Sequence, residues 1–236
     1  MTNVGFRITQ FENAEALAAI VADKWCRQIA EAKSLFTVAL SGGRIANDFF
    51  REVAARANQN DGIRQAHFFW ADERCVPPGH ADSNYRVARE LLLEPLQIEP
   101  SHVHRIRGED EPLTAAAAAS DELLRAAPLN SAGQPILDWV FLGMGEDGHV
   151  ASLFPGAEPR SGIYYDVVGP KPPPRRITLG YDVLALAREV WVLTSGRGKE
   201  LALRESLRPG GLTPLAGVLK MRKATEIFSD IPGKIP

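Results

Sequence analysis

One short segment places an acid and a histidine around a glycine, directly after an apolar run. Asp147 and His149 flank Gly148, and the preceding residues ILDWVFL are typical of a buried β-strand. A histidine beside a carboxylate at the end of a strand can act as a general base near neutral pH, because the acid fixes its tautomer and stabilises the imidazolium. The alternative interpretation is that His149 caps or packs the start of a short helix. The residues alone leave both open.

The glycines of this segment also match a dinucleotide-binding pattern. The spacing Gly-x-Gly-x-x-Gly is present at 143–148, and Asp166 follows at roughly the 20-residue distance at which a ribose-binding acid is sought. A dinucleotide fold needs a full crossover helix after the third glycine, whereas here Pro155 follows within a few residues. We therefore expect no dinucleotide at this site.

A second glycine loop lies between an apolar run and a helical pattern. Ser41, Gly42 and Gly43 follow residues 35–40, and amphipathic spacing begins at Arg44. Glycines at such a junction let the backbone approach an anion closely, while the free N–H groups and the dipole of the helix favour negative charge. A phosphate is the expected ligand of this loop, although glycine turns between a strand and a helix are also common without a ligand.

Charged residues follow the other expected strands. Asp72 and Arg74 come just after an aromatic strand, and Arg176 lies on a late strand. Lys199 falls in the first turn of an expected helix, where a cation opposes the dipole unless an anion shares the site. These side chains are candidates for binding a phosphorylated ligand. The alternative is a set of exposed ion pairs and solvated lysines.

The remaining histidines carry no such pattern. His102 and His104 alternate as two ligands on one strand face would, but no third ligand keeps the spacing, so we expect no metal site. His67 is interpreted as a strand residue and His80 as a loop residue.

The elements that must position these residues follow an alternating pattern. Short β-branched or aromatic runs alternate with longer helical ones, which predicts an α/β protein with βα units around a mainly parallel sheet. The expected strands cover residues 4–10, 35–40, 66–71, 136–142, 163–168, 174–179, 189–194 and 224–228. The expected helices cover residues 12–33, 44–58, 82–94, 112–127 and 197–208. Since ligands bind beyond the carboxyl ends of strands in open α/β sheets, we expect the two glycine loops to share one crevice.

Length and composition agree with one domain. The chain has 236 residues, 45% of them hydrophobic, and a net charge of −2, so we expect a single α/β domain over 1–236 without a nucleic-acid or membrane partner. Cys26 and Cys75 are the only cysteines, too few for a disulfide framework. No segment resembles a signal peptide or a membrane span, so a cytoplasmic protein is expected, as a monomer or a small homo-oligomer.

Taken in order, these segments resemble the 6-phosphogluconolactonases, relatives of the glucosamine-6-phosphate deaminases and isomerases. GEDGHVASLFP is the most specific match, because the deaminases usually have alanine-phenylalanine-asparagine-glutamate-proline where this chain has ASLFP. The resemblance implies a three-layer α/β sandwich with a mostly parallel Rossmann-like sheet, similar to the ribose-5-phosphate isomerase/glucosamine-6-phosphate deaminase fold. The matching stretches, which together span nearly the whole chain, are Ser-Gly-Gly at 41–43, WADERCVP and DSNYR within 70–86, LGMGEDGHVASLFPG at 142–156, RITL at 176–179, and Gly196 through Lys199.

The resemblance also implies a reaction and roles for residues. The reaction is hydrolysis of 6-phospho-D-glucono-1,5-lactone to 6-phosphogluconate, in the oxidative pentose phosphate pathway. His149 corresponds to the general base that activates water, and Asp147 to its orienting acid. Arg176 and Lys199 match positions that hold the substrate phosphate, with help from residues 41–43. No metal or organic cofactor is implied.

The loop after the first long apolar strand departs from the family pattern. Members usually continue it as serine-threonine-proline, whereas this chain has Arg44-Ile45-Ala46, so two hydroxyls that could donate to a phosphate are missing. We hypothesise that Arg44 makes a charge-assisted bond to the phosphate instead. Asp-Glu-Arg at 72–74, where deaminases have Asp-Glu-Tyr, favours a lactonase, and Arg74 matches a crevice arginine that binds phosphate or sugar hydroxyls.

Two other functions stay open. In a glucosamine-6-phosphate deaminase or a related isomerase, Asp72 would be the base that shuttles a proton, and ammonia release from glucosamine 6-phosphate would identify it. In a non-catalytic sugar-phosphate-binding module, which the altered residues 44–46 suggest, 6-phosphogluconate would bind without any lactone hydrolysis.

Overall fold

The structure is a computed structural model that describes residues 5–30, 36–57 and 61–232. Its centre is a sheet in the order β1-β9-β8-β5-β2-β3, in which every neighbouring pair is parallel. The strands of this sheet are β1 (Arg7–Gln10), β2 (Phe36–Leu40), β3 (Ala66–Trp70), β5 (Trp139–Gly143), β8 (Glu189–Thr194) and β9 (Glu226–Ser229).

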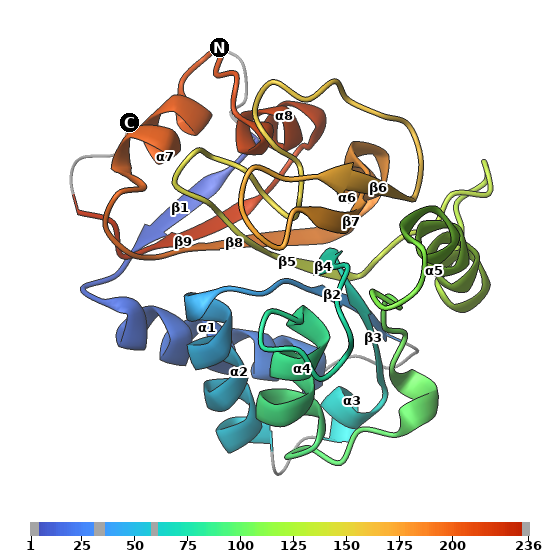
Figure 1. Ribbon diagram of the computed structural model, residues 1–236. Helices are drawn as coiled ribbons and strands as arrows, with labels where there is room; N and C mark the ends of the chain where they lie inside the picture. The colour runs from blue at the N-terminus through green and yellow to red at the C-terminus, as the bar shows by residue number, and fades with distance from the viewer. Residues whose placement is uncertain (1–4, 31–35, 58–60, 233–236) are drawn as a thin grey trace.

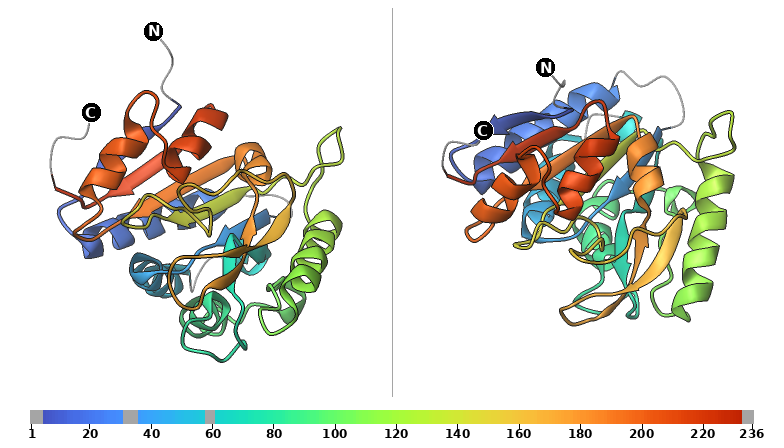
Figure 2. Two further views of the ribbon diagram at one scale, coloured as in Figure 1. Left: turned by 45° about the horizontal axis from the view of Figure 1, so that its top comes forward. Right: turned by 90° about the horizontal axis from the view of Figure 1, so that it is seen from above.

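Helices cover both faces of this sheet (Figure 1 and Figure 2). One face carries α1 (Ala14–Ala30), α2 (Arg44–Arg56), α3 (Asp61–Arg64) and α4 (Asn84–Ala88), the last continuing into a π-helical segment at Arg89–Leu93. The other face carries α6 (Tyr181–Leu186), α7 (Glu200–Leu207) and α8 (Pro214–Met221). The expected three-layer α/β sandwich is therefore confirmed. Within the described ranges, no helix has the length and apolar character needed to cross a membrane.

A second, smaller sheet stands beside the sandwich. It contains β4 (Asp72–Arg74), β7 (Arg175–Leu179) and β6 (Tyr164–Val168), all paired antiparallel, and α5 (Pro112–Ala126) packs against it. The sequence pattern predicted a mainly parallel sheet and did not separate these strands from it. The reason for the difference is the connection: residues 169–174 are too few for the crossover that parallel neighbours need, so β6 and β7 form a hairpin.

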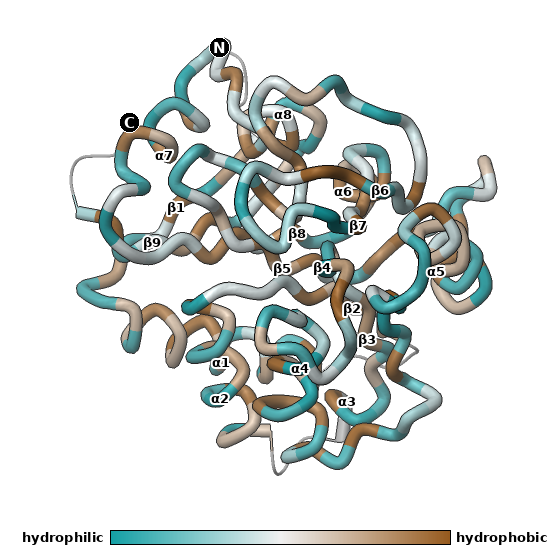
Figure 3. Tube along the Cα trace, viewed as in Figure 1, coloured by the Kyte–Doolittle hydropathy of each residue, from teal (hydrophilic) through white to brown (hydrophobic). Residues whose placement is uncertain are grey.

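The core lies between the parallel sheet and its helices. Every residue of β2 is buried, and the tube of Figure 3 is coloured as hydrophobic along much of the central strands. Trp25 of α1 meets Phe141 of β5 edge to face, with ring centroids 5.1 Å apart. Leu17 and Val21 precede Trp25 at four-residue spacing and are also fully buried, so one stripe of α1 anchors the helix to the sheet.

Most of the predicted elements are confirmed with shifted ends, and five short ones among the described residues were missed. The missed elements are β4, α3, α6, α8 and a 3-10 helix at Pro100–His102. The helix α8 has a start signal, because the Thr213 hydroxyl accepts from the Ala216 N–H (3.1 Å) and Pro214 follows the cap. The predicted helix at 197–208 begins only at Glu200, so Lys199 is its N-cap residue rather than part of its first turn. Parts of four predicted elements, at residues 4, 31–33, 35 and 58, lie outside the described residues.

The chain order places the two glycine loops at the centre of the sheet. Within the large sheet, the next strand along the chain after β2 is β3 on one side. The next strand after β5 is β8 on the other side, which the chain reaches through β6 and β7 of the small sheet. The connections that leave β2 and β5 therefore diverge, which opens a crevice beyond their carboxyl ends. Residues 41–43 and 144–149 lie at this point.

Candidate active site

One cavity of about 440 Å³ lies beyond the carboxyl ends of the parallel strands. Segments that follow β2, β3, β5, β8 and β9 all contribute to its wall, together with β7 from the small sheet. Of the ten site residues predicted from the sequence, nine line this cavity, and Asp147 lies directly behind one of them. The lining residues named by the sequence are Ser41, Gly42, Gly43, Arg44, Asp72, Arg74, His149, Arg176 and Lys199.

The His149–Asp147 pair is built by the tight turn after β5. The Gly145 N–H donates to the His149 carbonyl (2.9 Å), which folds the chain back, and Gly148 takes a positive φ of 81°. The His149 Nδ1–H donates to Oδ1 of Asp147 over 2.6 Å, and the His149 backbone N–H donates to the same oxygen over 3.2 Å. Nε2 of His149 is thereby left to act as an acceptor in the neutral ring.

The carboxyl group of Asp147 is held in its charged form. Burial would raise its pKa, but the hydrogen bonds from the His149 ring and backbone outweigh this effect and hold the pKa below its usual value. A Cβ at Gly145 would overlap both the His149 ring and the Asp147 carboxylate. The pair is thus packed against bare backbone, and only glycine leaves room for it.

The loop after β2 presents backbone and one hydroxyl to the cavity. Gly43 has φ 107° and caps α2 without a side-chain hydrogen bond, and the Ser41 Oγ is buried without a partner among the described residues. Gly42 packs against the side-chain amide of Asn84, and a Cβ there would overlap that amide. Because the buried Ser41 hydroxyl has no hydrogen-bond partner among the described residues, a ligand with oxygen atoms fits this part of the cavity.

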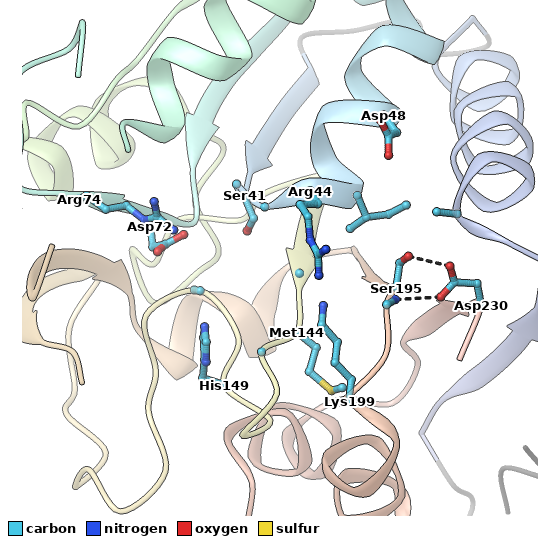
Figure 4. A pocket seen from close by; sticks show the side chains of 18 of the residues that line it. Ser41, Arg44, Asp48, Asp72, Arg74, Met144, His149, Ser195, Lys199 and Asp230 are labelled. Carbon is cyan, nitrogen blue, oxygen red and sulfur yellow. Dashed lines mark hydrogen bonds between the residues drawn. The ribbon is translucent and has the colours of Figure 1, made fainter. Parts of the chain in front are cut away.

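Arg44 and Lys199 approach one another at one end of the cavity. In Figure 4 the two side chains extend toward each other, Arg44 from the start of α2 and Lys199 from the N-cap of α7. Burial lowers the pKa of Lys199, and the charge of Arg44 lowers it further, while Asp230 and Glu146 act in the opposite direction. Within the part of the chain that the structure describes, neither cation forms an ion pair. Two unpaired cations that repel one another form a site for an anion.

Arg74 and Arg176 form a second cationic end. They are direct partners in the antiparallel pair β4–β7, so both project from the same face of the small sheet. Arg176 is only 6% exposed; burial lowers its pKa, and the charge of Arg74 adds to that shift. Asp72 and Asp82 act on the pKa of Arg176 in the opposite direction. The resemblance implies that Arg176 and Lys199 hold the substrate phosphate, and this stays a prediction. In the structure both residues line the cavity, and Arg74 is the cross-strand partner of Arg176.

Asp72 is held in place by hydrogen bonds from neighbouring polar side chains. Its carboxylate accepts from the Ser152 hydroxyl (2.6 Å) and from Nδ2 of Asn84 (3.2 Å), and the same Asn84 Nδ2 also donates to the Asp72 carbonyl (2.9 Å). Asn84 therefore connects the strand β4 to the loop at Gly42, which it contacts on its other side. Glu73 holds the start of α4 in place, because its buried carboxylate accepts from the N–H groups of Asn84 (2.8 Å) and Tyr85 (2.7 Å).

Sequence reasoning missed several residues of the site. Ser195 and Asp230 line the cavity beyond β8 and β9, and the Asp230 carboxylate accepts from the Ser195 hydroxyl (2.7 Å) and the Gly196 N–H (3.1 Å). The rule that carboxyl ends of parallel strands carry the site would have found both, had it been applied to every strand. Asn84 and Ser152 lie within the matching motifs but carry no charge that would single them out.

The described residues give no arrangement of three or more His, Cys, Asp or Glu side chains that could hold a metal ion. His104 hydrogen-bonds His67 and Glu122, while His102 contacts the Arg64 carbonyl and packs on the His67 ring with centroids 4.5 Å apart. The expectation that the protein uses no metal or organic cofactor stays a prediction.

Comparison with known proteins places this chain among sugar-phosphate enzymes. The family model described as Glucosamine-6-phosphate isomerases/6-phosphogluconolactonase matches residues 11–227. A 6-phosphogluconolactonase of Treponema pallidum is 37% identical over 80% of this chain and 79% of its own length, and 6-phosphogluconolactonase 3, chloroplastic, of Arabidopsis thaliana is 35% identical over 91% and 68%. The solved structure of 6-phosphogluconolactonase from Trypanosoma brucei superposes with a TM-score of 0.79 at 26% identity, over 94% of this chain and 95% of that one. The chain therefore belongs to the glucosamine-6-phosphate isomerase/6-phosphogluconolactonase family.

Proposed function

We propose that the protein hydrolyses 6-phospho-D-glucono-1,5-lactone to 6-phosphogluconate. The observation that carries this proposal is the placement of His149 in one cavity with the unpaired cations Arg44 and Lys199. A base with a free nitrogen and a separate anion site are what a phosphorylated lactone requires of an enzyme. The names of the relatives support the same substrate.

The reaction needs an activated water and a proton for the leaving oxygen. Neutral His149 takes a proton on Nε2 as the water oxygen attacks C1 of the lactone, and the Asp147 carboxylate stabilises the imidazolium that forms. The bond between C1 and the ring oxygen then breaks, and the ring oxygen receives the proton from His149 and becomes a hydroxyl. The new carboxylic acid releases its remaining proton to solvent, so lactone and water yield a carboxylate and one proton. Base catalysis of this kind contributes about 10²–10⁴-fold.

Arg44 and Lys199 bind the substrate phosphate in this proposal, with the N–H groups and the hydroxyl of the 41–43 loop. The cation pair at the start of α2 and α7 supports this assignment, because a dianionic phosphate would relieve the repulsion between the two side chains. Arg44 then supplies the donors that the missing serine and threonine would have given.

Replacing Arg44 by alanine tests the phosphate assignment. We expect a rise of roughly 10- to 100-fold in KM with a much smaller change in kcat, because a charge-assisted bond to a remote group is lost. Arg204→Ala, which removes an exposed arginine from α7, is the matched control and leaves both constants unchanged. An unaltered KM in Arg44→Ala removes Arg44 from the site.

The activity itself is tested with lactone generated in place. Glucose-6-phosphate dehydrogenase supplies the lactone, and its disappearance is followed with and without the protein, against the spontaneous rate. A parallel assay measures ammonia release from glucosamine 6-phosphate. Lactone loss no faster than the spontaneous rate, or release of ammonia, rejects the lactonase.

We further propose a cytoplasmic protein that works as a monomer or a small homo-oligomer without a nucleic-acid partner. The net charge of −2 supports the absence of nucleic-acid binding. Light scattering coupled to gel filtration measures the oligomeric state directly, and a large assembly would contradict this expectation.

A further inference from the structure

The cavity has two cationic ends, although the substrate of the proposed reaction has only one anionic group. Arg44 and Lys199 form one end, and Arg74 and Arg176 form the other. In Figure 4, His149 lies between the Arg44–Lys199 pair and the side chains of Asp72 and Arg74. The product differs from the substrate in this respect, because hydrolysis creates a carboxylate at C1 in addition to the phosphate.

At the Arg74–Arg176 end, guanidinium N–H groups without a partner among the described residues can donate to a ligand. Two arginines directly opposite each other on paired strands repel, so their placement costs stability unless an anion joins them. Arg176 uses Nε and Nη2 to donate to the carbonyls of Pro173 (3.1 Å) and Lys171 (3.4 Å), which leaves Nη1 without a partner among the described residues. Arg74 donates through Nη1 to the Asp82 carbonyl (2.8 Å), while its Nε is buried and has no described partner.

Asp72 does not neutralise this end. Its two carboxylate oxygens accept from Ser152 (2.6 Å) and Asn84 (3.2 Å), and it forms no ion pair with either arginine in the described part of the chain. Asp82, the other acid that acts on Arg176, has a half-exposed side chain that faces His80, so solvent screens its charge. Two cations and one buried anion leave this end positive.

Arg176 and His149 share one aromatic neighbour, Phe154. The Arg176 guanidinium stands 5.6 Å from the ring centre of Phe154, and the His149 ring lies 5.1 Å from the same ring. One phenyl ring therefore packs against both side chains. The Arg44–Lys199 pair has no comparable contact with His149 among the described residues.

We propose that Arg74 and Arg176 bind the C1 oxygens, first the oxyanion that forms during hydrolysis and then the carboxylate of the product. This inference rests on the proposed function and fixes the direction of the substrate in the cavity. The phosphate lies at Arg44 and Lys199, the lactone carbonyl lies at Arg74 and Arg176, and His149 delivers water between them. Donors aimed at charge that appears only in the transition state lower the barrier more than donors to the neutral carbonyl.

The chemistry at C1 places the charge where these arginines are. When the water oxygen bonds to C1, the carbonyl electron pair moves onto its oxygen, and that oxygen carries a full negative charge until the bond to the ring oxygen breaks. After the break the same oxygen is half of a carboxylate. The site therefore holds the product at both ends, and we expect 6-phosphogluconate to inhibit the enzyme.

A comparison of two ligands tests the site without any turnover. Calorimetry measures the binding of 6-phosphogluconate and of glucitol 6-phosphate, which has a hydroxymethyl group in place of the carboxylate. The wild-type protein binds the carboxylate ligand more tightly. In Arg176→Gln and Arg74→Gln, 6-phosphogluconate loses roughly 10- to 100-fold in affinity while glucitol 6-phosphate is little affected. In Lys199→Met both ligands lose affinity by the same factor, because both carry the phosphate.

The matched control is Arg175→Gln, which removes the exposed arginine next to Arg176 and leaves both affinities unchanged. Equal losses for the two ligands in Arg176→Gln would assign Arg176 to the phosphate and overturn the proposal. Should Arg176→Gln lose its cooperative thermal transition, Arg74→Gln, from a less buried position, gives the same test. A wild-type protein that discriminates between the ligands but does not hydrolyse the lactone would reject the proposed function and leave the carboxylate site standing.

Discussion

The protein contains two histidine–carboxylate pairs with almost the same geometry. His149 Nδ1 lies 2.6 Å from Asp147, and His104 Nδ1 lies 2.5 Å from Glu122. The His149 side chain is 27% exposed and lines the large cavity, whereas the His104 side chain is 7% exposed and stacks on Phe69 at 4.5 Å.

The difference between the pairs lies in the second ring nitrogen. Glu122 accepts from Nδ1 of His104, so Nε2 of the neutral ring accepts from His67 Nδ1 over 2.7 Å, and no lone pair is left for a substrate. In His149 the second nitrogen has no such partner among the described residues. A histidine beside an acid is thus a base only where its other nitrogen opens onto a cavity that binds substrate.

The largest expected effect comes from replacing each of the two histidines, one at a time, by glutamine. His149→Gln lowers kcat/KM by about 10²–10⁴-fold and leaves the melting temperature unchanged, because a base is lost but no buried contact. His104→Gln keeps the activity and lowers the free energy of unfolding by about 1–3 kcal/mol, because Glu122 and His67 lose a buried partner. Lactone hydrolysis and thermal unfolding of both variants check this. Near-normal turnover in His149→Gln would contradict the proposed base.

Replacing the carboxylate of each pair, Asp147 or Glu122, distinguishes the two pairs in the same way, with a smaller effect on activity. Asp147→Asn keeps an acceptor for the His149 Nδ1–H but removes the charge that stabilises the imidazolium, so we expect kcat to fall about 10- to 100-fold. Glu122→Gln is the counterpart and leaves kcat unaltered. Equal kcat values in Asp147→Asn and the wild type would leave Asp147 with a structural role only.

A glycine beside the first pair sharpens the comparison further. Gly145→Ala introduces a Cβ that displaces the His149 ring and the Asp147 carboxylate, so we expect a loss of about tenfold in kcat from misplacement of the base. Gly79→Ala is the control, since a Cβ there meets nothing within 4 Å. Circular dichroism checks that both variants are folded. An active Gly145→Ala protein would mean that the position of the ring is not critical.

The smallest expected effect is on the pH dependence of stability, and it comes from His67, which is hydrogen-bonded to His104 of the second pair. Burial, together with the neighbouring charges of His102 and His104, lowers the pKa of His67 to about 4. At pH values between about 4 and 6.5, His67 is protonated in the unfolded chain but neutral in the folded chain. The contribution of His67 to the free energy of unfolding is therefore fully present above about pH 6.5 and is lost as the pH falls toward 4.

His67→Phe removes this dependence. The melting temperature of the wild type is expected to fall by about 2–4 °C more than that of His67→Phe between pH 7 and pH 4.5, a modest change because the ring is partly exposed to solvent. His80→Gln, which removes a loop histidine, keeps the wild-type dependence and serves as control. Parallel pH curves for His67→Phe and the wild type would show that His67 does not titrate as described.

The sequence predicted the parallel sheet and the position of its glycine loops for a clear reason. The nearly wholly apolar runs at 35–40 and 140–142 are typical of strands covered on both faces, and the loops after such parallel strands lie at one edge of the sheet. It did not predict the small sheet. The strand β4 has only three residues, which are charged or polar, and no local pattern shows that Asp72 pairs with Thr178 across more than a hundred positions.

Local sequence by itself determined the glycine-rich loop at 143–149, the glycine loop at 41–43 between a strand and a helix, and the presence of a histidine with its acid. Tertiary structure alone decided which cations act together, pairing Arg44 with Lys199 and Arg74 with Arg176. It also decided that His149 lines the cavity of about 440 Å³ with no partner for its Nε2 among the described residues, while Nε2 of His104 is bonded to another histidine. The physical reason is that residue type and spacing fix what a group can do, whereas contacts between distant segments fix its solvent exposure and its charged neighbours.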